Sequence, residues 1–324
     1  MLEHAADAEL DVVAIGSAMV EITPARMGRS LEDVEEMRPL PSGSAANFAG
    51  ALAALDTRVG LISRVGADEL GRWLTSRLGR LGVDTRFIKS VEGQLTPISF
   101  AWMDQEGEKT FYFYRFPGHC DPMGTLGESD IERSEAIAGR IFDFTEAAMR
   151  NEPLRSAALR AARIAKEVGR TVCYAVNYRP SAWCGQSENE IIQTQENACS
   201  HADIAIMNHE EATLVSSTDD PERQLHRIAD LGPTTVIISR GEQGAHMLDR
   251  GTVYDVHARD VEVLYDIGAG DSFHAGFIAG LISGMNVSEA ARFASDAAAL
   301  RISRPAGAPH PGFDEVRRLS AERA

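Results

Sequence analysis

Residues 265–277 read Tyr265-Asp-Ile-Gly268-Ala269-Gly270-Asp271-Ser-Phe-His-Ala-Gly276-Phe277. A glycine-rich turn here runs directly into a pattern of apolar side chains that is typical of a helix. The first backbone N–H groups of a helix have no partner within it, and the helix dipole is positive at that end. Glycines let a ligand approach the backbone closely. The stretch therefore predicts an anion-binding helix N-terminus, with Asp271 where the N–H groups converge.

Asp271 has two interpretations. In the first, the helix N-terminus keeps the carboxylate ionised, so that it accepts a proton at neutral pH as a general base. In the second, Gly268 and Gly270 form a tight turn and Asp271 caps the helix. The sequence fits neither G-x-G-x-x-G nor G-x-x-x-x-G-K-[ST], because residue 273 is Phe and the chain has no Gly-Lys pair. A phosphate loop here would be of another type.

Short apolar runs alternate with longer helical patterns over most of the chain. This alternation indicates βαβ units around a mainly parallel sheet flanked by helices. Two further pairs of strand-like runs have no helix between them, and we interpret them as a small separate β layer. The predicted core strands are residues 11–15, 59–65, 141–144, 171–176, 204–207 and 235–239; the helices are 45–55, 68–81, 153–168 and 210–215; the β-layer strands are 20–22, 37–40, 97–103 and 109–115.

We expect one α/β domain over residues 1–324, with a discontinuous β lid from about 19–42 and 95–117. Ligands bind open sheets of this kind at the carboxyl ends of the strands, where such a lid would cover them. The stretch 124–134 is the expected flexible connection. Unpaired lid edges favour pairing with a second copy, so we expect a homodimer through the β lid.

The composition argues against two classes of partner. The 324 residues include 32 Lys and Arg against 48 Asp and Glu, a net charge of −16, far from the basic balance of nucleic-acid-binding proteins. The longest apolar stretches fall short of a membrane-spanning helix, which needs roughly 18 residues, and the acidic N-terminus does not resemble a secretory signal. We expect a cytoplasmic protein with no nucleic-acid or membrane partner. The scattered cysteines suggest neither a zinc site nor disulfides.

Two further motifs follow predicted strands. Asn208 and Glu211 come after strand 204–207 and commonly just begin a helix, yet an oxygen-rich pair there also suits Mg²⁺ held through water and phosphate. Gly241 and Gly244 follow strand 235–239 and are either turn glycines or ligand contacts. For each pair, the sequence leaves open both the structural and the ligand-binding interpretation.

Together these motifs resemble the PfkB (ribokinase-like) family of sugar kinases. Gly268-Ala-Gly-Asp271 matches its C-terminal signature, and Asn208-His-Glu-Glu211 matches its Asn-x-x-Glu motif. The N-terminal signature resembles Ser42-Gly43-Ser-Ala-Ala-Asn47, with Ser42 in place of the first of two glycines. Residues 239–244 resemble the turn that lines the nucleotide. The four motifs occur in the family's order and the resemblance covers roughly residues 11–312.

The resemblance implies a ribokinase-like fold and an ATP-dependent kinase that phosphorylates an alcohol, with ATP and Mg²⁺ as cofactors. It implies that Asp271 is the catalytic base and that the backbone amides before it stabilise the migrating phosphoryl group. The residues implied are, for catalysis, Asp271, Gly268, Ala269 and Gly270; for the nucleotide, Asn208, Ser239, Gly241 and Gly244; and for Mg²⁺, through water, Glu211.

Within the family, the sequence most resembles 2-keto-3-deoxygluconate kinases, with fructokinases next. Residues 175–183 are similar to their Asp-x-Asn-x-Arg-x-x-x-Trp segment, with Ala175 in place of the Asp, and Phe113-Tyr114-Arg115 is similar to their lid strand. Two guanidinium groups suit a carboxylate, so a small sugar acid, most of all 2-keto-3-deoxygluconate, is the expected substrate. The implied substrate-binding residues are Glu21, Gly43, Asn47, Tyr114, Arg115 and Arg179.

Three alternatives stay open at this point. The acceptor is fructose, another neutral ketohexose or a nucleoside; or the chain is a sugar-binding homologue that has lost catalysis; or the two arginines are ordinary surface side chains. His274, three residues after Asp271, is expected to be a packing residue rather than a catalytic one.

Overall fold

The computed structural model describes residues 8–26, 28–103, 109–114, 121–183, 185–265, 267–305 and 307–322. Within these ranges a nine-stranded sheet has the order β13-β12-β11-β10-β9-β8-β1-β4-β5. The strands from β11 to β5 are parallel to their neighbours, and β12 and β13 are antiparallel. The bounds are β1 Leu10–Ile15, β4 Val59–Gly66, β5 Ile88–Val91, β8 Gly139–Thr145, β9 Thr171–Ala175, β10 Ile204–Asn208, β11 Thr235–Ser239, β12 Ala245–Asp249 and β13 Thr252–Val256.

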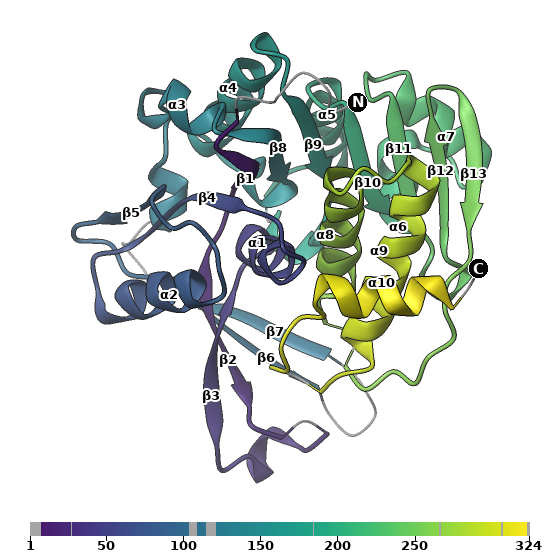
Figure 1. Ribbon diagram of the computed structural model, residues 1–324. Coiled ribbons are helices and arrows are strands. Elements are labelled where there is room, and N and C mark those ends of the chain that lie inside the picture. The colour runs from purple at the N-terminus through teal and green to yellow at the C-terminus, as the bar shows by residue number, and fades with distance from the viewer. Residues whose placement is uncertain are drawn as a thin grey trace.

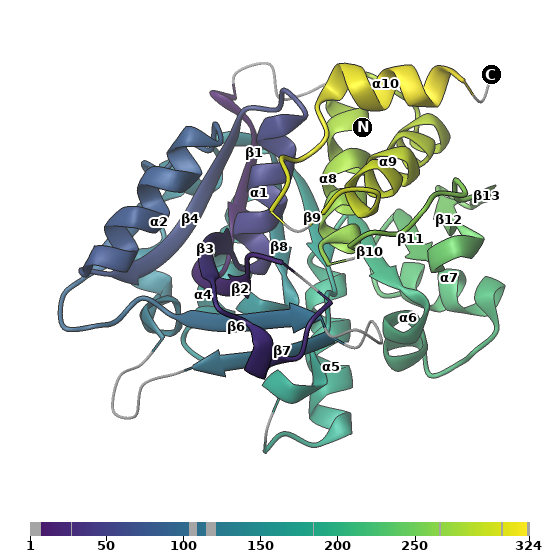
Figure 2. The same ribbon diagram turned by 90° about the horizontal axis from the view of Figure 1, so that it is seen from below.

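Helices cover both faces of this sheet, as Figures 1 and 2 show. One apolar core lies under α1, α2, α8, α9 and α10, and a second lies under α3 to α7. The central strands are buried on both faces, which explains their continuous apolar runs. The bounds are α1 Ser44–Ala54, α2 Glu69–Arg80, α3 Arg133–Ala136, α4 Leu154–Glu167, α5 Glu188–Ser200, α6 His209–Ser216, α7 Pro221–Ala229, α8 Ala269–Ile282, α9 Val287–Ile302 and α10 Phe313–Ala321.

A separate four-stranded sheet has the order β3-β2-β6-β7 and projects from the main body (Figure 1). It consists of two antiparallel pairs joined by parallel pairing between β2 and β6. This confirms the predicted β layer and the mainly parallel α/β fold. That the chain is one domain with this sheet as its lid remains a prediction. The bounds are β2 Met19–Pro24, β3 Met37–Ser42, β6 Ile98–Met103 and β7 Lys109–Tyr114.

Two local expectations were wrong. Residues 124–134, expected to be a flexible connection, lie in short helical turns, where Asp130 accepts a hydrogen bond from the Gly127 N–H and pairs with Arg64 at 2.7 Å. The spacing of Gly276, Gly280 and Gly284 by four residues predicts close packing of this helix against the sheet. Instead α8 packs on α9, and a Cβ at Gly276 or Gly280 would lie within 3 Å of an α9 alanine Cα.

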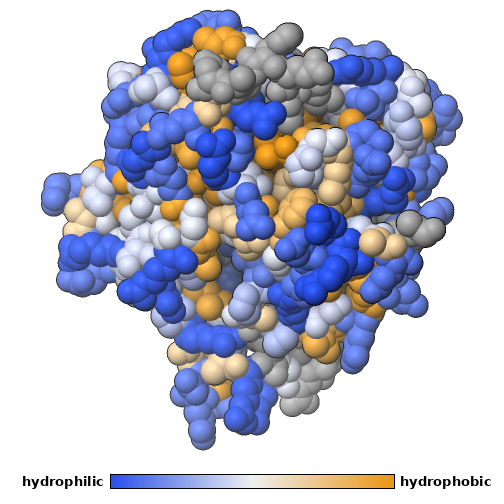
Figure 3. Space-filling view, in the orientation of Figure 1, coloured by the Kyte–Doolittle hydropathy of each residue, from blue (hydrophilic) through white to orange (hydrophobic). Residues whose placement is uncertain are grey.

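The parallel strands bring two predicted nucleotide-binding residues, Asn208 and Ser239, to one edge of the sheet. β10 and β11 end at Asn208 and Ser239, and Asn177 follows the end of β9. None of the helices in the described ranges is long and apolar enough to cross a membrane. The face in Figure 3 is mainly hydrophilic, with hydrophobic side chains in small separate patches.

Candidate active site

The site is built around the N-terminus of α8. Gly268 is the N-cap residue and has φ 85°, a left-handed conformation that favours glycine. The Ser272 N–H donates to the Gly268 carbonyl at 3.0 Å, which closes the first turn. The earlier N–H groups of this turn point out of the helix, as the glycine-rich sequence predicts.

Asp271 lies in this first turn and is held by two side-chain amides. Asn47 Nδ2 donates to Asp271 Oδ2 at 3.2 Å, and Asn177 Nδ2 donates to Oδ1 at 3.2 Å. The interpretation of Asp271 as the helix cap is wrong, because the N-cap is Gly268 and the Asp271 carboxylate accepts hydrogen bonds from two asparagine side chains. Three segments, α1, the loop after β9 and α8, therefore position one carboxylate.

Burial raises the pKa of Asp271 above the ordinary aspartate value. The hydrogen bond from Asn47 and the electrostatic effects of Arg179, His274 and Arg301 act in the opposite direction. The helix N-terminus was expected to keep this carboxylate ionised, but loss of solvent has the larger effect. A carboxylate with a raised pKa is a stronger base, which suits the acceptance of a proton.

Gly43 begins α1 and allows Asn47 to reach Asp271. Its φ is 107°, and a Cβ there would lie 2.4 Å from the carbonyl oxygen of Ser17. The backbone at residue 43 therefore passes closer to the loop after β1 than a residue with a side chain would allow. The Asn47 N–H donates to the Gly43 carbonyl at 2.8 Å, which places the Asn47 side chain on the first turn of α1.

Glu21 lies on β2, and its side chain is buried near Asp271. Ser42 Oγ donates to Glu21 Oε2 at 3.1 Å. Burial raises the pKa of Glu21, and the nearby charge of Asp271 raises it further. Ser42, which replaces a family glycine, thus gains a contact that glycine cannot make. Ala175, the other departure, is the last residue of β9 and is buried.

Asn208 and Glu211 form a reciprocal cap at the start of α6. The Glu211 N–H donates to Asn208 Oδ1, and the Asn208 N–H donates to Glu211 Oε2, both at 2.8 Å. Glu211 Oε1 accepts from the Tyr178 N–H at 2.7 Å. Burial raises the pKa of Glu211. The helix-start interpretation is confirmed, and it also ties α6 to the loop that carries Asn177.

The turn after β11 requires glycine at one position. Gly244 has φ 90°, and a Cβ there would lie 1.9 Å from the Val256 carbonyl oxygen. Gly241 has φ 58° and open space around the position of its missing Cβ. Ser239 ends β11 beside this turn and is partly exposed. In the structure, the predicted turn at residues 241–244 therefore lies directly after β11.

Of the two arginines that are predicted to bind a carboxylate, the structure describes only Arg179. Arg115 lies outside the described residues. Arg179 is exposed and donates to its neighbour's carbonyl, Tyr178 O, at 3.2 Å. Tyr114, at the end of β7, is 56% exposed and contacts Phe100 edge to face, with ring centroids 5.3 Å apart. Tyr114 thus stays a predicted substrate contact.

His274 lies one turn after Asp271 and is buried, as expected of a packing residue. Its ring stacks on Phe48 with centroids 4.0 Å apart. Its Nε2 lies 2.8 Å from Asp143 Oδ2 and 3.4 Å from Cys173 Sγ. This buried polar cluster links α8 to β8 and β9 beneath the site, and sequence reasoning did not find it because its members lie on three separate elements.

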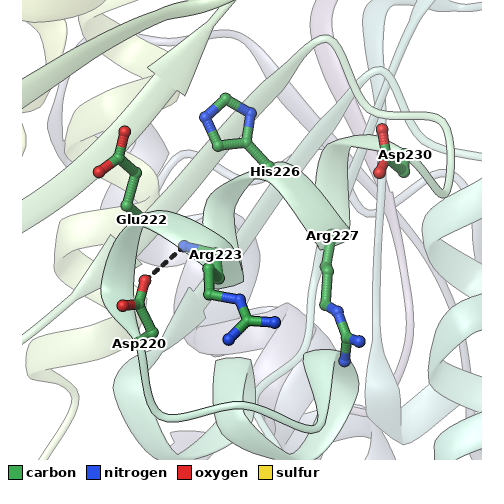
Figure 4. A pocket seen from close by; sticks show the side chains of 6 residues that line it. All are labelled: Asp220, Glu222, Arg223, His226, Arg227 and Asp230. Carbon is green, nitrogen blue, oxygen red and sulfur yellow. Dashed lines mark hydrogen bonds between the residues drawn. The ribbon is translucent and has the colours of Figure 1, made fainter.

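Two further site features were missed by sequence reasoning. Asn177 lies within residues 175–183 but is not among the residues that the resemblance implies for the site. Its φ of 37° is uncommon for a residue other than glycine. Arg301, at the end of α9, is buried beside Gly268. A surface hollow elsewhere contains none of the predicted residues: Figure 4 shows side chains from α7 and its ends, namely Asp220, Glu222, Arg223, His226, Arg227 and Asp230.

The chain is similar in sequence to known proteins over most of its length. The chain is 27% identical to a 5-dehydro-2-deoxygluconokinase of Shouchella clausii, over 97% of this chain and 96% of that protein. It is 28% identical to a probable chloroplastic fructokinase-6 of Arabidopsis thaliana, over 90% of this chain and 77% of that protein.

A solved structure has the same fold. It is a putative ribokinase II from E. coli in complex with ATP and Mg²⁺, with a TM-score of 0.85 and 25% identity, covering 97% of this chain and 100% of that one. The family described as pfkB family carbohydrate kinase matches residues 9–311. The chain therefore belongs to the pfkB family of carbohydrate kinases, which transfer a phosphoryl group to a hydroxyl group.

Proposed function

We propose that this protein uses ATP and Mg²⁺ to phosphorylate the primary hydroxyl of a six-carbon keto-deoxy sugar acid. The observation that supports this best is Asp271, held by Asn47 and Asn177 at the N-terminus of α8. When bound, ATP supplies the phosphoryl group and Mg²⁺ neutralises charge on its phosphates. 2-Keto-3-deoxygluconate is the acceptor that the sequence predicts, and its isomer 5-dehydro-2-deoxygluconate is named for several relatives.

Asp271 is the proposed general base. It takes the proton of the acceptor hydroxyl while the hydroxyl oxygen bonds to phosphorus and ADP leaves. Asn47 and Asn177 orient its two oxygens, so that the free lone pairs face the acceptor. The amides of Gly268, Ala269 and Gly270 stabilise the charge that develops on the migrating group.

The nucleotide is proposed to lie along the ends of β10 and β11. Its contacts would be Asn208, Ser239, Gly241 and Gly244, where Gly244 keeps the backbone close to β13. Glu211 would hold Mg²⁺ through water, since both of its oxygens already accept backbone N–H groups. This fits the preference of Mg²⁺ for keeping several waters.

The acceptor is proposed to lie between the small sheet and α1. Glu21, Gly43, Asn47 and Tyr114 would contact its hydroxyl groups, and Arg115 and Arg179 would bind its carboxylate. The small sheet would close over the acceptor as a lid and exclude water. The exposed aromatic strand β7 supports a homodimer through this lid, since Phe111 to Tyr114 are each more than 40% exposed.

A coupled assay of ADP release tests the proposed acceptor. The panel contains both keto-deoxy acids, fructose, ribose and a nucleoside, each with wild type and with the Arg115→Ala and Arg179→Ala variants. The exposed Arg292→Ala on α9 is the matched control. We expect the acids to be preferred and the two site variants to lose that preference. Equal turnover of acids and neutral sugars would reject the acid assignment.

Fructose is the second candidate acceptor. The buried Glu21 carboxylate, which accepts a hydrogen bond from Ser42, is suited to a sugar hydroxyl, and one relative is named a probable fructokinase. The same panel separates the two candidates, because fructose turnover would not depend on Arg179.

A further inference from the structure

Arg301 is a buried cation that the proposed reaction does not yet use. It lies in the last turn of α9 and is 8% exposed. Its Nε and Nη1 atoms are buried, and within the described part of the chain neither has a hydrogen-bond partner. Arginine is seldom buried to this degree unless it is paired, because its charge and its N–H groups lose their water.

The guanidinium is close to the anion-binding turn. A Cβ on Gly268, the N-cap of α8, would lie 3.8 Å from Arg301 Nε. The helices α8 and α9 pack closely through Gly276 and Gly280, which brings the end of α9 beside the start of α8. The positive charge of Arg301 therefore lies beside the N-terminus of α8, where the helix dipole is also positive.

The surrounding groups do not neutralise Arg301. Its guanidinium carbon lies 5.5 Å from the ring centre of Tyr265, a cation–π contact. Asp271 and Glu21 interact with it electrostatically, but neither forms an ion pair with it. Burial lowers the pKa of Arg301, as expected of a cation that has lost more solvation than these neighbours return.

The nearby arginine on the same chain segment behaves differently. Arg304 pairs with Glu315 and donates to the Pro309 carbonyl at 2.8 Å. Arg304 thus has the partners of a structural arginine. Arg301, one turn earlier, has no such partner at Nε or Nη1 among the described residues, and its Nε lies beside Gly268.

We propose that Arg301 is a phosphoryl-binding residue, whose guanidinium pairs with an oxygen of the transferred group of ATP when that group settles on the Gly268–Asp271 turn. This deepens the proposed function and rests on it for the nucleotide, but not for the identity of the sugar. A guanidinium is suited to this role because its planar N–H groups match the oxygens of a phosphoryl group.

Equilibrium binding by calorimetry tests the proposal without any acceptor sugar. The titrants are Mg²⁺ with ADP and Mg²⁺ with the non-hydrolysable β,γ-imido analogue of ATP, which differ by the terminal phosphoryl group. The proteins are wild type, Arg301→Gln, Arg301→Lys and, as a matched control on the exposed face of α9, Arg292→Gln.

We expect Arg301→Gln to weaken binding of the ATP analogue about tenfold or more, with ADP binding changed by less than about twofold. Arg301→Lys should lie between Arg301→Gln and wild type, since it keeps the charge without the planar geometry. Arg292→Gln should match wild type. If Arg301→Gln does not fold, Arg301→Lys carries the comparison, with the same selective loss expected.

Two kinds of result would overturn the proposal, and a third separates it from the proposed substrate. Unchanged binding of both nucleotides, or equal weakening of both, would remove Arg301 from the terminal phosphoryl group. An unchanged nucleotide affinity with a raised KM for the acceptor would assign the guanidinium to the sugar instead. A sugar panel without any accepted acid would reject the proposed substrate, and it would leave the calorimetric result unaffected.

Discussion

Asn47 and Asp271 lie 224 positions apart in the chain, and the amide of the first donates to the carboxylate of the second at 3.2 Å. Each residue stands in the first turn of its helix, α1 or α8, and each turn begins with a glycine at positive φ. The two family signatures, far apart in the sequence, therefore meet at one carboxylate.

The first prediction concerns Asp271 as the base. Asp271→Asn keeps the shape and the hydrogen-bonding reach of the side chain but removes the basic oxygen. We expect kcat to fall by about 10²–10⁴, with nucleotide affinity nearly unchanged. Steady-state kinetics and calorimetry measure these, and the exposed Asp219→Asn is the control. Unaltered turnover would remove Asp271 from the role.

The second prediction concerns the pH dependence. Removing the amide in Asn47→Ala withdraws a hydrogen bond that favours the charged carboxylate, so the pKa of Asp271 should rise further. The base is active when deprotonated, and the acid limb of the kcat/KM profile should therefore move to higher pH. Exposed Asn197→Ala serves as the control. A shift to lower pH, or none, would contradict this account.

The third prediction concerns stability. The folded-state pKa of Asp271 is above the unfolded value, so the folded protein loses stability as the pH rises past the unfolded pKa and the buried carboxylate must ionise. Asp271→Asn stays neutral and should raise Tm at pH 7 by a few degrees. Thermal unfolding at several pH values measures the gain, which should shrink under acidic conditions. A lower Tm at pH 7 would show that the charge stabilises the fold.

The fourth prediction compares two glycines of one turn. A methyl group at Gly244 would collide with the Val256 carbonyl, whereas the same group at Gly241 meets open space. Gly244→Ala should therefore cost about 1–3 kcal/mol more of unfolding free energy than Gly241→Ala. Urea unfolding of both variants provides the comparison. Equal costs would mean that β13 moves away easily.

The fifth prediction concerns assembly. Strand β7 is an edge of the small sheet and exposes Tyr112 and three aromatic neighbours. Light scattering at micromolar concentration should give the mass of a dimer, and Tyr112→Asp should reduce it to that of a monomer. A monomeric mass for the wild type would count against pairing through the lid.

The sequence predicts the strands that are buried on both faces, because their continuous apolar runs are unambiguous. It also predicts the two antiparallel pairs of the small sheet, because no helical pattern separates their members. It misses β12 and β13, because they follow a turn rather than a helix and most of β13 is not buried. It also misses the packing of α8 on α9, since glycine spacing does not reveal which neighbour approaches.

Some residues of the candidate site can be found from the sequence, and others cannot. Asp271 and Asn47 belong to local motifs with recognisable spacing, so sequence reasoning finds them. The role of Ser42 depends on its position opposite Met19 across the sheet, which brings its hydroxyl to Glu21. Arg301 gives no local signal at all, because a charged residue near the end of a helix is ordinary until its burial is known.

The three-way contact at Asp271 joins α1, the loop after β9 and α8, and these segments come from widely separated parts of the polypeptide. During synthesis, α1 and β9 emerge from the ribosome long before α8 does. Until then Asn47 and Asn177 have no carboxylate to hold, so this part of the site cannot form on the incomplete chain. The contact is thus completed only when the helix that begins at Gly268 packs against the earlier segments.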